Sequence, residues 1–322
     1  MKIGNIEIDS RTASLAPMAG VADRAFRELC VGYGASYVVS EMVSSKGLTM
    51  CDRKSKKLLQ LSEKEMPAAA QIFGNDPEIM ALSAKSCLEY NPVAIDINMG
   101  CPAPKIAGNG GGSALLKNPG LAQKIMESVR QAVDIPVTVK IRLGWDSDSI
   151  NCIEMAQRAQ KAGMDAITVH GRTRQQMYAP LVDRKMIAEV KKSVDIPVIA
   201  NGDIIDGISA AQMIEETNCD YIMVGRGALG RPWVFSQINA YLKDGVILPE
   251  PPVSERMRVM VEHIKKICEY KGEKIGIREA RKHAAWYIKG VKGAAAYRQQ
   301  VGMLESIEQL EELAFKIMKE NM

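Results

Sequence analysis

Short apolar runs recur at regular intervals through the first two thirds of the chain. Eight of them are rich in β-branched or small apolar residues, and each ends in a glycine, an asparagine or another polar turn residue. They lie at 13–17, 36–41, 67–73, 93–97, 136–142, 165–170, 196–200 and 220–224. Runs of this kind predict strands that are buried on both faces, as in a parallel sheet.

Most of the gaps between these runs carry apolar residues at helical spacing, for example Leu121 to Ala132 and Ile150 to Ala162. Strands that alternate with helices predict an α/β fold, and eight such units fit a closed (β/α)8 TIM barrel. An internal echo supports this, because Val133-Asp-Ile-Pro-Val137 recurs as Val194-Asp-Ile-Pro-Val198. A doubly wound open sheet is the alternative, although eight strands of this spacing fit closure better.

The strand pattern stops at a proline-rich segment, Pro249-Glu-Pro-Pro252, which predicts a stiff linker over residues 249–253. From residue 254 to 322 no strand pattern is visible, and three or four helices can be drawn, with Ser254 as the expected N-cap of the first. We therefore expect a catalytic barrel in residues 1–248 and a small all-helical domain in residues 254–322.

The formal net charge of +4 is unevenly distributed between these two parts. Residues 1–253 carry 28 Lys and Arg and 28 Asp and Glu, which cancel. Residues 254–300 carry 12 Lys and Arg against 5 Asp and Glu, a net charge of +7, and residues 301–322 carry −3. A basic block confined to one region predicts that this region meets a polyanionic partner.

Several functional classes do not fit the composition. No apolar run approaches the ~18–20 residues of a membrane span, and the amino terminus is too polar for a signal peptide. We therefore expect a cytoplasmic location and no membrane partner. The seven cysteines and three histidines lack the spacing of zinc or iron–sulfur ligands, so no metal is expected. An odd number of cysteines in an intracellular chain favours free thiols.

A cysteine lies directly after the fourth predicted strand, in the segment Asn-Met-Gly-Cys-Pro-Ala-Pro at 98–104. TIM barrels carry their chemistry at the carboxyl ends of the strands. Pro102 and Pro104 would hold Cys101 in place at that end. Position alone leaves two interpretations open: a catalytic thiol, or a structural thiol that closes a turn.

Polar residues and glycines follow the other predicted strands as well. The strand-end positions are Ala16, Pro17, Met18, Gln71, Asn98, Lys140, Arg142, His170, Asn201, Gly202, Asp203, Gly225, Arg226 and Gly227. The last two groups follow strands seven and eight, where barrels commonly bind phosphate through backbone amides. Tight-turn glycines beside a surface arginine are the alternative interpretation.

Three of these positions suit a cofactor with a planar ring. Lys140 ends an otherwise buried strand, so its charge needs a partner: either a ring system that becomes negative on reduction or a strand-end acid such as Asp96. His170 either donates a hydrogen bond to a cofactor or caps the sixth strand. Gln71, together with Asn98, suits hydrogen bonding to a heterocycle with donor and acceptor edges.

Seven motifs, in order along the chain, closely resemble the tRNA-dihydrouridine synthases, most strongly the bacterial type B (DusB-like) subfamily. They are A-P-M-A-G-V-x-D near the start, Q-I-F-G at 71–74, D-I-N-M-G-C-P at 96–102, V-K-I-R-L-G at 139–144, V-H-G-R-T at 169–173, N-G-D-I at 201–204 and V-G-R-G-A-L-G-R-P-W at 224–233. The resemblance covers nearly the whole chain, including the C-terminal Arg281-Lys282-His283 and Trp286-Tyr287.

The resemblance implies an enzyme that reduces the carbon 5–carbon 6 double bond of specific uridines in tRNA, with NADPH as reductant and tightly bound FMN. Hydride would reach carbon 6 while Cys101 gives a proton to carbon 5. The expected FMN-binding residues are Ala16, Pro17, Met18, Gln71, Asn98, Lys140, His170, Asn201, Gly202, Asp203, Gly225 and Arg226. Residues 105–114, with glycines at 110–112, resemble the family's mobile loop. Lys140 and Arg142 are expected to face the flavin rather than the sulfur of Cys101.

The basic C-terminal region is expected to bind the tRNA. Four cations recur there at near-helical spacing and predict one basic face: Arg278, Arg281, Lys282 and Lys289. Arg142 of the barrel is also expected to contact the nucleic acid. The opposite, apolar stripe is Ala280, Ala284, Tyr287 and Val291. Such cations are commonly only a solvated face, but the local charge of +7 favours RNA. Trp286 and Tyr287 are expected to pack in the core rather than to stack on bases.

Three other functions compete with this one. The nearest is an FMN-dependent barrel oxidoreductase for a small molecule, of the dihydroorotate dehydrogenase-like or ene-reductase-like kind, which has no need of a basic helical appendage. A non-catalytic RNA-binding barrel would not need a thiol, a lysine and a histidine at its strand ends. A phosphosugar barrel would need a carboxylate base at a strand end, and none is seen.

Overall fold

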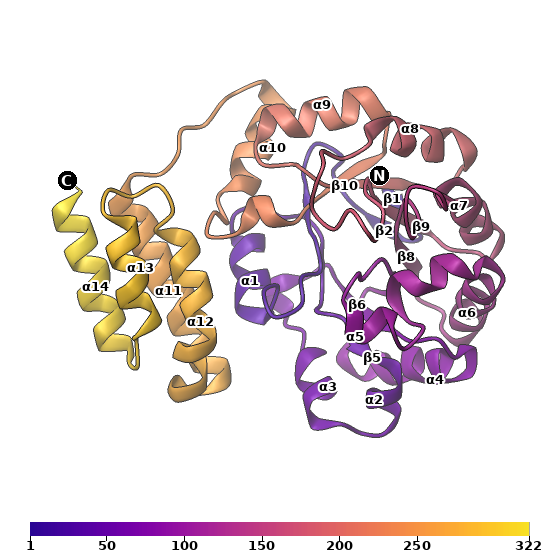
Figure 1. Cartoon of the computed structure of the whole chain (residues 1–322), viewed down its shortest axis with the longest axis horizontal. Coiled ribbons are helices and arrows are strands. Elements are labelled where there is room, and N and C mark those ends of the chain that lie inside the picture. Colours follow the sequence, from indigo (N-terminus) through magenta and orange to yellow (C-terminus); the bar gives the residue numbers. More distant parts are fainter. Residues whose placement is uncertain (322) are drawn as a thin grey trace.

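Eight parallel strands close into a barrel in the computed structural model, which describes residues 1–321 (Figure 1). They are β3 (Ser14–Leu15), β4 (Val38–Val39), β6 (Ala68–Phe73), β7 (Ala94–Met99), β8 (Val137–Arg142), β9 (Ala166–His170), β10 (Val198–Asn201) and β11 (Tyr221–Val224). Each pairs with the next in this order, and β11 pairs with β3 to complete the ring. The predicted (β/α)8 TIM barrel is therefore confirmed, with all eight predicted strands.

Helices follow most of these strands and cover the outside of the barrel (Figure 1). They are α1 (Arg24–Gly32), α2 (Ser45–Thr49), α3 (Arg53–Leu58), α4 (Pro77–Cys87), α6 (Pro119–Ala132), α7 (Cys152–Lys161), α8 (Arg184–Ser193), α9 (Gly207–Thr217) and α10 (Val234–Asp244). The helix expected from Ile150 begins two residues later, because Ile150 instead forms an antiparallel bridge with Gly144.

Several short elements were not predicted, because two to four residues are too few for a periodic pattern. An N-terminal hairpin, β1 (Lys2–Ile3) and β2 (Ile6–Glu7), buries Ile3 in a cluster with Ala94 and Ala166, the first residues of their strands. The hairpin thus covers the amino end of the barrel. β5 (Val43–Ser44) extends the sheet beside the carboxyl end of β6, and α5 (Pro104–Ala107) follows β7.

The barrel interior is polar near the carboxyl ends of the central strands. Side chains alternate between the two faces of a strand, so Ile95 and Ile97 of β7 pack in the apolar layer beneath the helices. Asp96 and Asn98, the intervening residues, face inward, where they bond to the side chain of Gln71 on β6. A run that reads as a continuous apolar strand thereby places polar groups in the barrel mouth.

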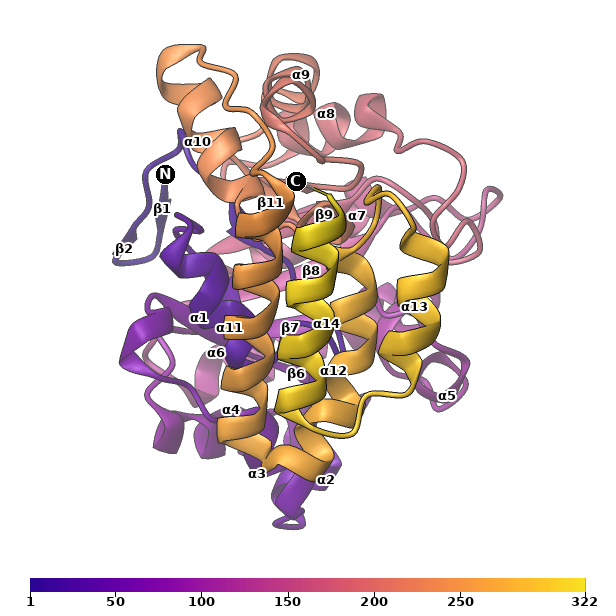
Figure 2. The same cartoon turned by 90° about the vertical axis from the view of Figure 1, so that its left-hand side faces the viewer.

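Four C-terminal helices form a separate bundle beside the barrel (Figures 1 and 2). They are α11 (Val253–Lys271), α12 (Glu273–Tyr287), α13 (Ala294–Gly302) and α14 (Ile307–Glu320), and they share one apolar cluster. The prediction of Ser254 as N-cap is wrong. The cap position belongs to Pro252, with a φ of −59°, and Ser254 lies inside the first turn. A proline has no N–H to satisfy and a helix-compatible φ, so it starts the helix without a side-chain cap.

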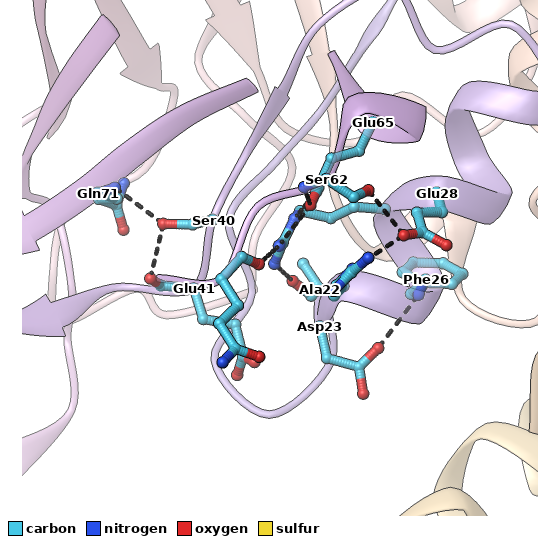
Figure 3. A network of polar contacts seen from close by, with 12 residues as sticks. Ala22, Asp23, Phe26, Glu28, Ser40, Glu41, Ser62, Glu65 and Gln71 are labelled. Atoms are coloured by element: carbon cyan, nitrogen blue, oxygen red, sulfur yellow. Dashed lines mark hydrogen bonds and ion pairs between the residues drawn. The ribbon is translucent and has the colours of Figure 1, made fainter. Parts of the chain in front are cut away.

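Polar contacts join the bundle to α1 of the barrel. Asp23 caps α1 by accepting from the Phe26 N–H at 3.1 Å (Figure 3), and its other oxygen accepts from Lys271 Nζ of α11 at 2.6 Å. Tyr270 donates to Glu28 at 2.7 Å. Next to these contacts, Arg27 forms a fully buried ion pair with Glu65. These contacts hold α11 of the bundle against α1 of the barrel.

Candidate active site

One large cavity, of about 1180 Å³, opens at the carboxyl ends of the strands. All twelve residues expected to bind FMN line this cavity, and Cys101 and Arg142 line it as well. The cavity is also lined by residues that the sequence did not single out as ligands, from the bundle and the segments before it: Arg231, Glu250, Arg256 and Trp286. The structure thus gathers the strand-end residues around one space, while their individual binding roles stay predictions.

A tight turn holds Cys101 at the end of β7. The Oδ1 atom of Asn98 accepts the N–H groups of Gly100 at 3.2 Å and Cys101 at 2.9 Å. The carbonyl of Cys101 accepts the N–H of Ser113 at 3.1 Å. Gly112 lies against this turn with a φ of +56°, and a Cβ there would lie 2.9 Å from the Cys101 carbonyl oxygen. Only glycine fits this close approach, a second reason for the glycine run besides flexibility.

The thiol of Cys101 is partly exposed to the cavity. Burial raises its pKa, and the N–H of Ala103 and the charge of Arg142 act more weakly in the opposite direction. A thiol with a raised pKa stays protonated at neutral pH. Cys101 is therefore suited to donate a proton rather than to attack as a thiolate.

Arg142 braces the same turn from β8. Its Nε donates to the Gly100 carbonyl at 2.8 Å, and its Nη1 donates to the carbonyls of Thr173 at 2.9 Å and Met177 at 3.1 Å. Burial lowers its pKa to about 10. The donors of Arg142 are occupied by backbone carbonyls, one of them in the cysteine turn, and its charge acts on the thiol. The expectation that Arg142 faces the flavin rather than the sulfur stays a prediction. Its contact with RNA stays a prediction.

Lys140, two residues before Arg142 on β8, reaches across to β10. Its Nζ donates to Oδ1 of Asn201 at 2.9 Å, and Nδ2 of Asn201 donates to the Met223 carbonyl at 2.8 Å. Burial lowers the pKa of Lys140 to about 8. The expected alternative, an ion pair with Asp96, is not formed, since Asp96 accepts from uncharged neighbours. The hydrogen bond of Lys140 thus goes to a neutral amide and not to a carboxylate.

His170 ends β9 on the same rim. Its Nε2 lies 3.4 Å from Nη1 of Arg172. Burial strongly lowers the pKa of His170, and Lys140 and the neighbouring arginines lower it further. The imidazole is therefore neutral at physiological pH, with one nitrogen able to donate and the other able to accept.

The loop after β10 is held in a left-handed backbone conformation. The φ angles are +125° at Gly202 and +52° at Asp203. The carboxylate of Asp203 accepts from Arg172 at 2.6 Å, from the Val182 N–H at 3.0 Å and from Arg226 at 3.3 Å. Asp203 thus organises the loop through its side chain, which leaves its backbone for a ligand. Arg172, fully buried at the centre of these contacts, was missed, although the V-H-G-R-T motif contains it.

The loop after β11 approaches the same region from the neighbouring strand. A Cβ on Gly227 would lie 2.3 Å from the Ile204 carbonyl oxygen, so the two loops pack backbone to backbone. At Gly225 a Cβ would meet only Ala16 and Met18, at 3.8 and 4.0 Å. The guanidinium of Arg226 lies 4.5 Å above the ring of Tyr178, a contact that local sequence could not predict.

The predicted basic face, which lies on α12 and extends just past its end to Lys289, is formed only in part. Arg278, Lys282 and Lys289 are exposed, and Lys289 also lines the cavity. Arg281 instead donates twice to the Leu304 carbonyl, at 3.0 and 2.6 Å. The predicted apolar stripe is buried throughout, at Ala280, Ala284, Tyr287 and Val291. Trp286 does not pack fully in the core as expected, because it is half-buried and lines the cavity.

Two further properties bear on the class of protein. All seven cysteines are free thiols. In residues 1–321 no group of three or more His, Cys, Asp and Glu side chains is placed to hold a metal ion. Over the same part of the chain, none of the helices combines the length and the apolar character needed to cross a membrane.

The fold and the site together define a TIM-barrel enzyme with its cavity at the carboxyl ends of the strands. Two solved structures share the fold at low sequence identity. Histamine dehydrogenase from Rhizobium sp. 4-9 matches with a TM-score of 0.56 and 12% identity, over 83% of this chain and 50% of that chain. Morphinone reductase matches with a TM-score of 0.54 and 10% identity, over 80% of this chain and 91% of that chain.

Sequence comparison is more specific. The family model for dihydrouridine synthase matches residues 14–321. The chain is 43% identical over 308 residues to tRNA-dihydrouridine synthase B of Pseudomonas aeruginosa, covering 96% of this chain and 92% of the relative. It is 42% identical over 314 residues to the protein of the same name from Proteus vulgaris, covering 97% of both. This chain belongs to the dihydrouridine synthase family and is therefore an oxidoreductase, as its motifs indicate.

Proposed function

We propose that this enzyme reduces specific uridines of tRNA to dihydrouridine, with FMN bound in the barrel and NADPH as reductant. The names of its full-length relatives and its family support the substrate. The observation that carries the rest is the single cavity in which Cys101 and all twelve expected FMN-binding residues meet. The division into an FMN-binding barrel (1–248), a linker (249–253) and a tRNA-binding helical domain (254–322) belongs to this proposal, as does a cytoplasmic location.

The residues around the cavity fit a flavin nucleotide. The volume of about 1180 Å³ exceeds the usual range for a single small ligand, so a cofactor and a substrate base have room together. Gln71, Asn98 and Asn201 offer amide groups to a heterocycle, and Lys140 offers a positive charge. The loops at 201–204 and 225–227 bring backbone close to the cavity, where a phosphate would be bound.

Bound FMN would supply hydride transfer between NADPH and carbon 6 of the uracil ring. Reduction of the double bond also needs a proton at carbon 5, and Cys101 would donate it from the face opposite the flavin. The raised pKa of the thiol keeps that proton in place until it is needed. Arg142 and Asn98 hold the turn that carries the thiol, so both would fix the direction of the donation.

The tRNA would be held mainly by the C-terminal bundle. A uracil stacked in folded RNA cannot reach the barrel mouth, so its nucleotide must swing out of the stack. Phosphate contacts would stabilise that arrangement. Lys289 and Trp286 line the cavity and belong to the same C-terminal segment as the exposed Arg278 and Lys282. A continuous path would therefore lead from the basic face to Cys101.

Mass spectrometry of tRNA from cells with and without this gene tests the proposal. We expect nucleosides heavier than uridine by two hydrogens to disappear at specific positions when the gene is deleted, and to return with the wild-type gene. The purified protein should carry flavin absorbance. Unchanged dihydrouridine at every position in the deletion strain, or a protein that neither contains nor binds a flavin, would contradict the proposal.

A further inference from the structure

A buried acid lies at the start of a chain of hydrogen bonds in the barrel interior. Asp96 of β7 is only 3% exposed and has no cationic partner. Its Oδ2 accepts from Nε2 of Gln71 at 2.7 Å, and its Oδ1 bonds to the hydroxyl of Thr138. These three residues are directly opposite one another on β6, β7 and β8. Asp96 thus joins the middle three strands below the cavity.

The chain continues from Gln71 to the turn that holds Cys101. Oε1 of Gln71 accepts from Nδ2 of Asn98 at 2.9 Å. Oδ1 of Asn98 then accepts the N–H groups of Gly100 and Cys101. The backbone of Gln71 is also fixed, because its N–H donates to Ser40 at 2.9 Å (Figure 3). Three successive hydrogen bonds therefore lead from Asp96 to the backbone of the cysteine.

Each amide in this chain can adopt one orientation only. An amide has a donor end and an acceptor end. Because Asp96 Oδ2 accepts from Gln71, the Gln71 oxygen must face Asn98, and the Asn98 oxygen must then face the Cys101 N–H. The Thr138 hydroxyl can donate or accept, so it suits Asp96 in either protonation state. Burial raises the pKa of Asp96, yet Oδ2 remains an acceptor in both states.

We infer that Asp96 is a positioning residue for Cys101, acting through the fixed orientations of Gln71 and Asn98. This inference rests on the proposed role of Cys101 as proton donor. The inference also explains why Asp96 is buried without forming an ion pair with Lys140. The contacts of Asp96 orient amide groups and do not balance a charge. The second amide hydrogen of Asn98, which lines the cavity, takes no part in these contacts.

Substitution of Asp96 tests the inference, and substitution of Thr138, the other hydrogen-bond partner of Asp96, serves as the control. Asp96→Leu removes the acceptor that orients Gln71. Thr138→Val also removes the Asp96–Thr138 contact, but it leaves Gln71 held. Asp96→Asn keeps an oxygen for Gln71 and places its amino group on Thr138, which can accept. All variants carry Cys51→Ser, because Cys51 is exposed and its thiol would compete for the alkylating reagent.

The measurement is the rate at which iodoacetamide alkylates Cys101, followed by mass spectrometry of the peptide. A loosened turn exposes the thiol, so Asp96→Leu should raise the rate about tenfold, the factor that corresponds to ~1.4 kcal/mol. Thr138→Val and Asp96→Asn should stay within about twofold of the parent. A structural role alone would raise the rate equally in Asp96→Leu and Thr138→Val. If Asp96→Leu does not fold, Gln71→Met breaks the next contact and should give the same rise.

An alkylation rate in Asp96→Leu within about twofold of the parent, or an equal rise in Thr138→Val, would overturn the inference. Dihydrouridine formation provides the second readout, since it should fall about tenfold in Asp96→Leu and recover in Asp96→Asn. The proposed function is tested apart from this, with Cys101→Ala. Full product formation in that variant would remove the proton-donor role, while the alkylation result would still report on the positioning of the turn.

Discussion

Lys140 donates its hydrogen bond to Asn201 and not to Asp96, although both lie in the same barrel interior. An amide is a weak partner for a buried charge, so the ammonium group retains most of its cost of burial. This explains why burial lowers its pKa to about 8. A lysine placed in this way gains much of its stabilisation from an anionic ligand.

The binding of FMN should therefore weaken above pH 8. Lys140 loses its proton as the pH rises through about 8, and with it the attraction for a negatively charged ligand. Between pH 7.5 and 9 the affinity of the apoprotein for FMN should fall by up to about tenfold. Equilibrium titration with FMN, followed by quenching of flavin fluorescence, measures this.

Two variants serve as controls for this pH dependence. Lys140→Arg keeps its charge through pH 9 and should lose the dependence, whereas Lys140→Met should bind weakly at every pH. The pH dependence of stability has the opposite sign. Below pH 8 the free protein carries the buried charge, so its stability should rise between pH 8 and pH 10.5, where only the unfolded chain binds the proton. An FMN affinity that is flat from pH 7 to 9 in the parent would contradict the role of Lys140.

Cys101→Ala should separate the two half-reactions. The substitution removes the proton donor but no residue expected to bind FMN, so flavin content and NADPH oxidation should match the parent. Dihydrouridine formation should fall by about 10²-fold or more, in line with loss of a general acid. Single-turnover reduction of tRNA by the prereduced enzyme measures this step directly. Product formation at the parent rate would mean that another group donates the proton.

The strands and their carboxyl-end residues could be predicted because a barrel buries its strands on both faces. Local sequence was enough to mark Cys101, Lys140 and the glycine loops. The orientation of polar groups could not be predicted in the same way. Whether Lys140 pairs with Asp96 or Asn201 depends on distances across the barrel, which periodicity does not encode.

The bundle shows the same limit. Helical spacing predicted the buried stripe of α12 correctly, since that stripe follows from periodicity alone. It placed Arg281 on the basic face, but a loop distant in sequence supplies the Leu304 carbonyl that takes both of its bonds. Trp286 was expected in the core, and the cavity that exposes one side of it exists only once the bundle lies beside the barrel.

Three exposed cations on and just after α12 should account for part of the salt dependence of tRNA binding. Arg278, Lys282 and Lys289 are exposed, while Arg281 is bonded to Leu304. Replacing these three with Gln should weaken tRNA binding at low salt and reduce the slope of log K against log salt by about 2–3. Filter binding at several salt concentrations measures the slope.

A matched control for this variant uses exposed lysines on the outer barrel helices, Lys85, Lys124 and Lys161. Their replacement by Gln changes the net charge by the same amount and should leave the slope nearly unchanged. Arg281→Gln should behave differently from both, because loss of two bonds to a carbonyl lowers the melting temperature. Equal slopes for the α12 variant and the barrel control would show that the basic face does not contact the RNA.

Adjacent glycines in the loop after Cys101 should differ sharply in their tolerance of a methyl group. Gly112 has a φ of +56°, and a Cβ there would lie 2.9 Å from the Cys101 carbonyl oxygen and 3.1 Å from its Cβ. Gly112→Ala should therefore destabilise the protein by at least ~1–2 kcal/mol, the cost of a left-handed residue, and should also displace Cys101. Gly111 has an ordinary φ of −96°, and its nearest neighbours would lie 3.7 Å from a Cβ. Gly111→Ala should keep the parent's melting temperature and activity. Chemical denaturation and product formation are measured on both variants. If the glycine run serves flexibility alone, the two substitutions will have equal effects. If close packing against the cysteine turn is the reason, only Gly112→Ala will lower stability and activity.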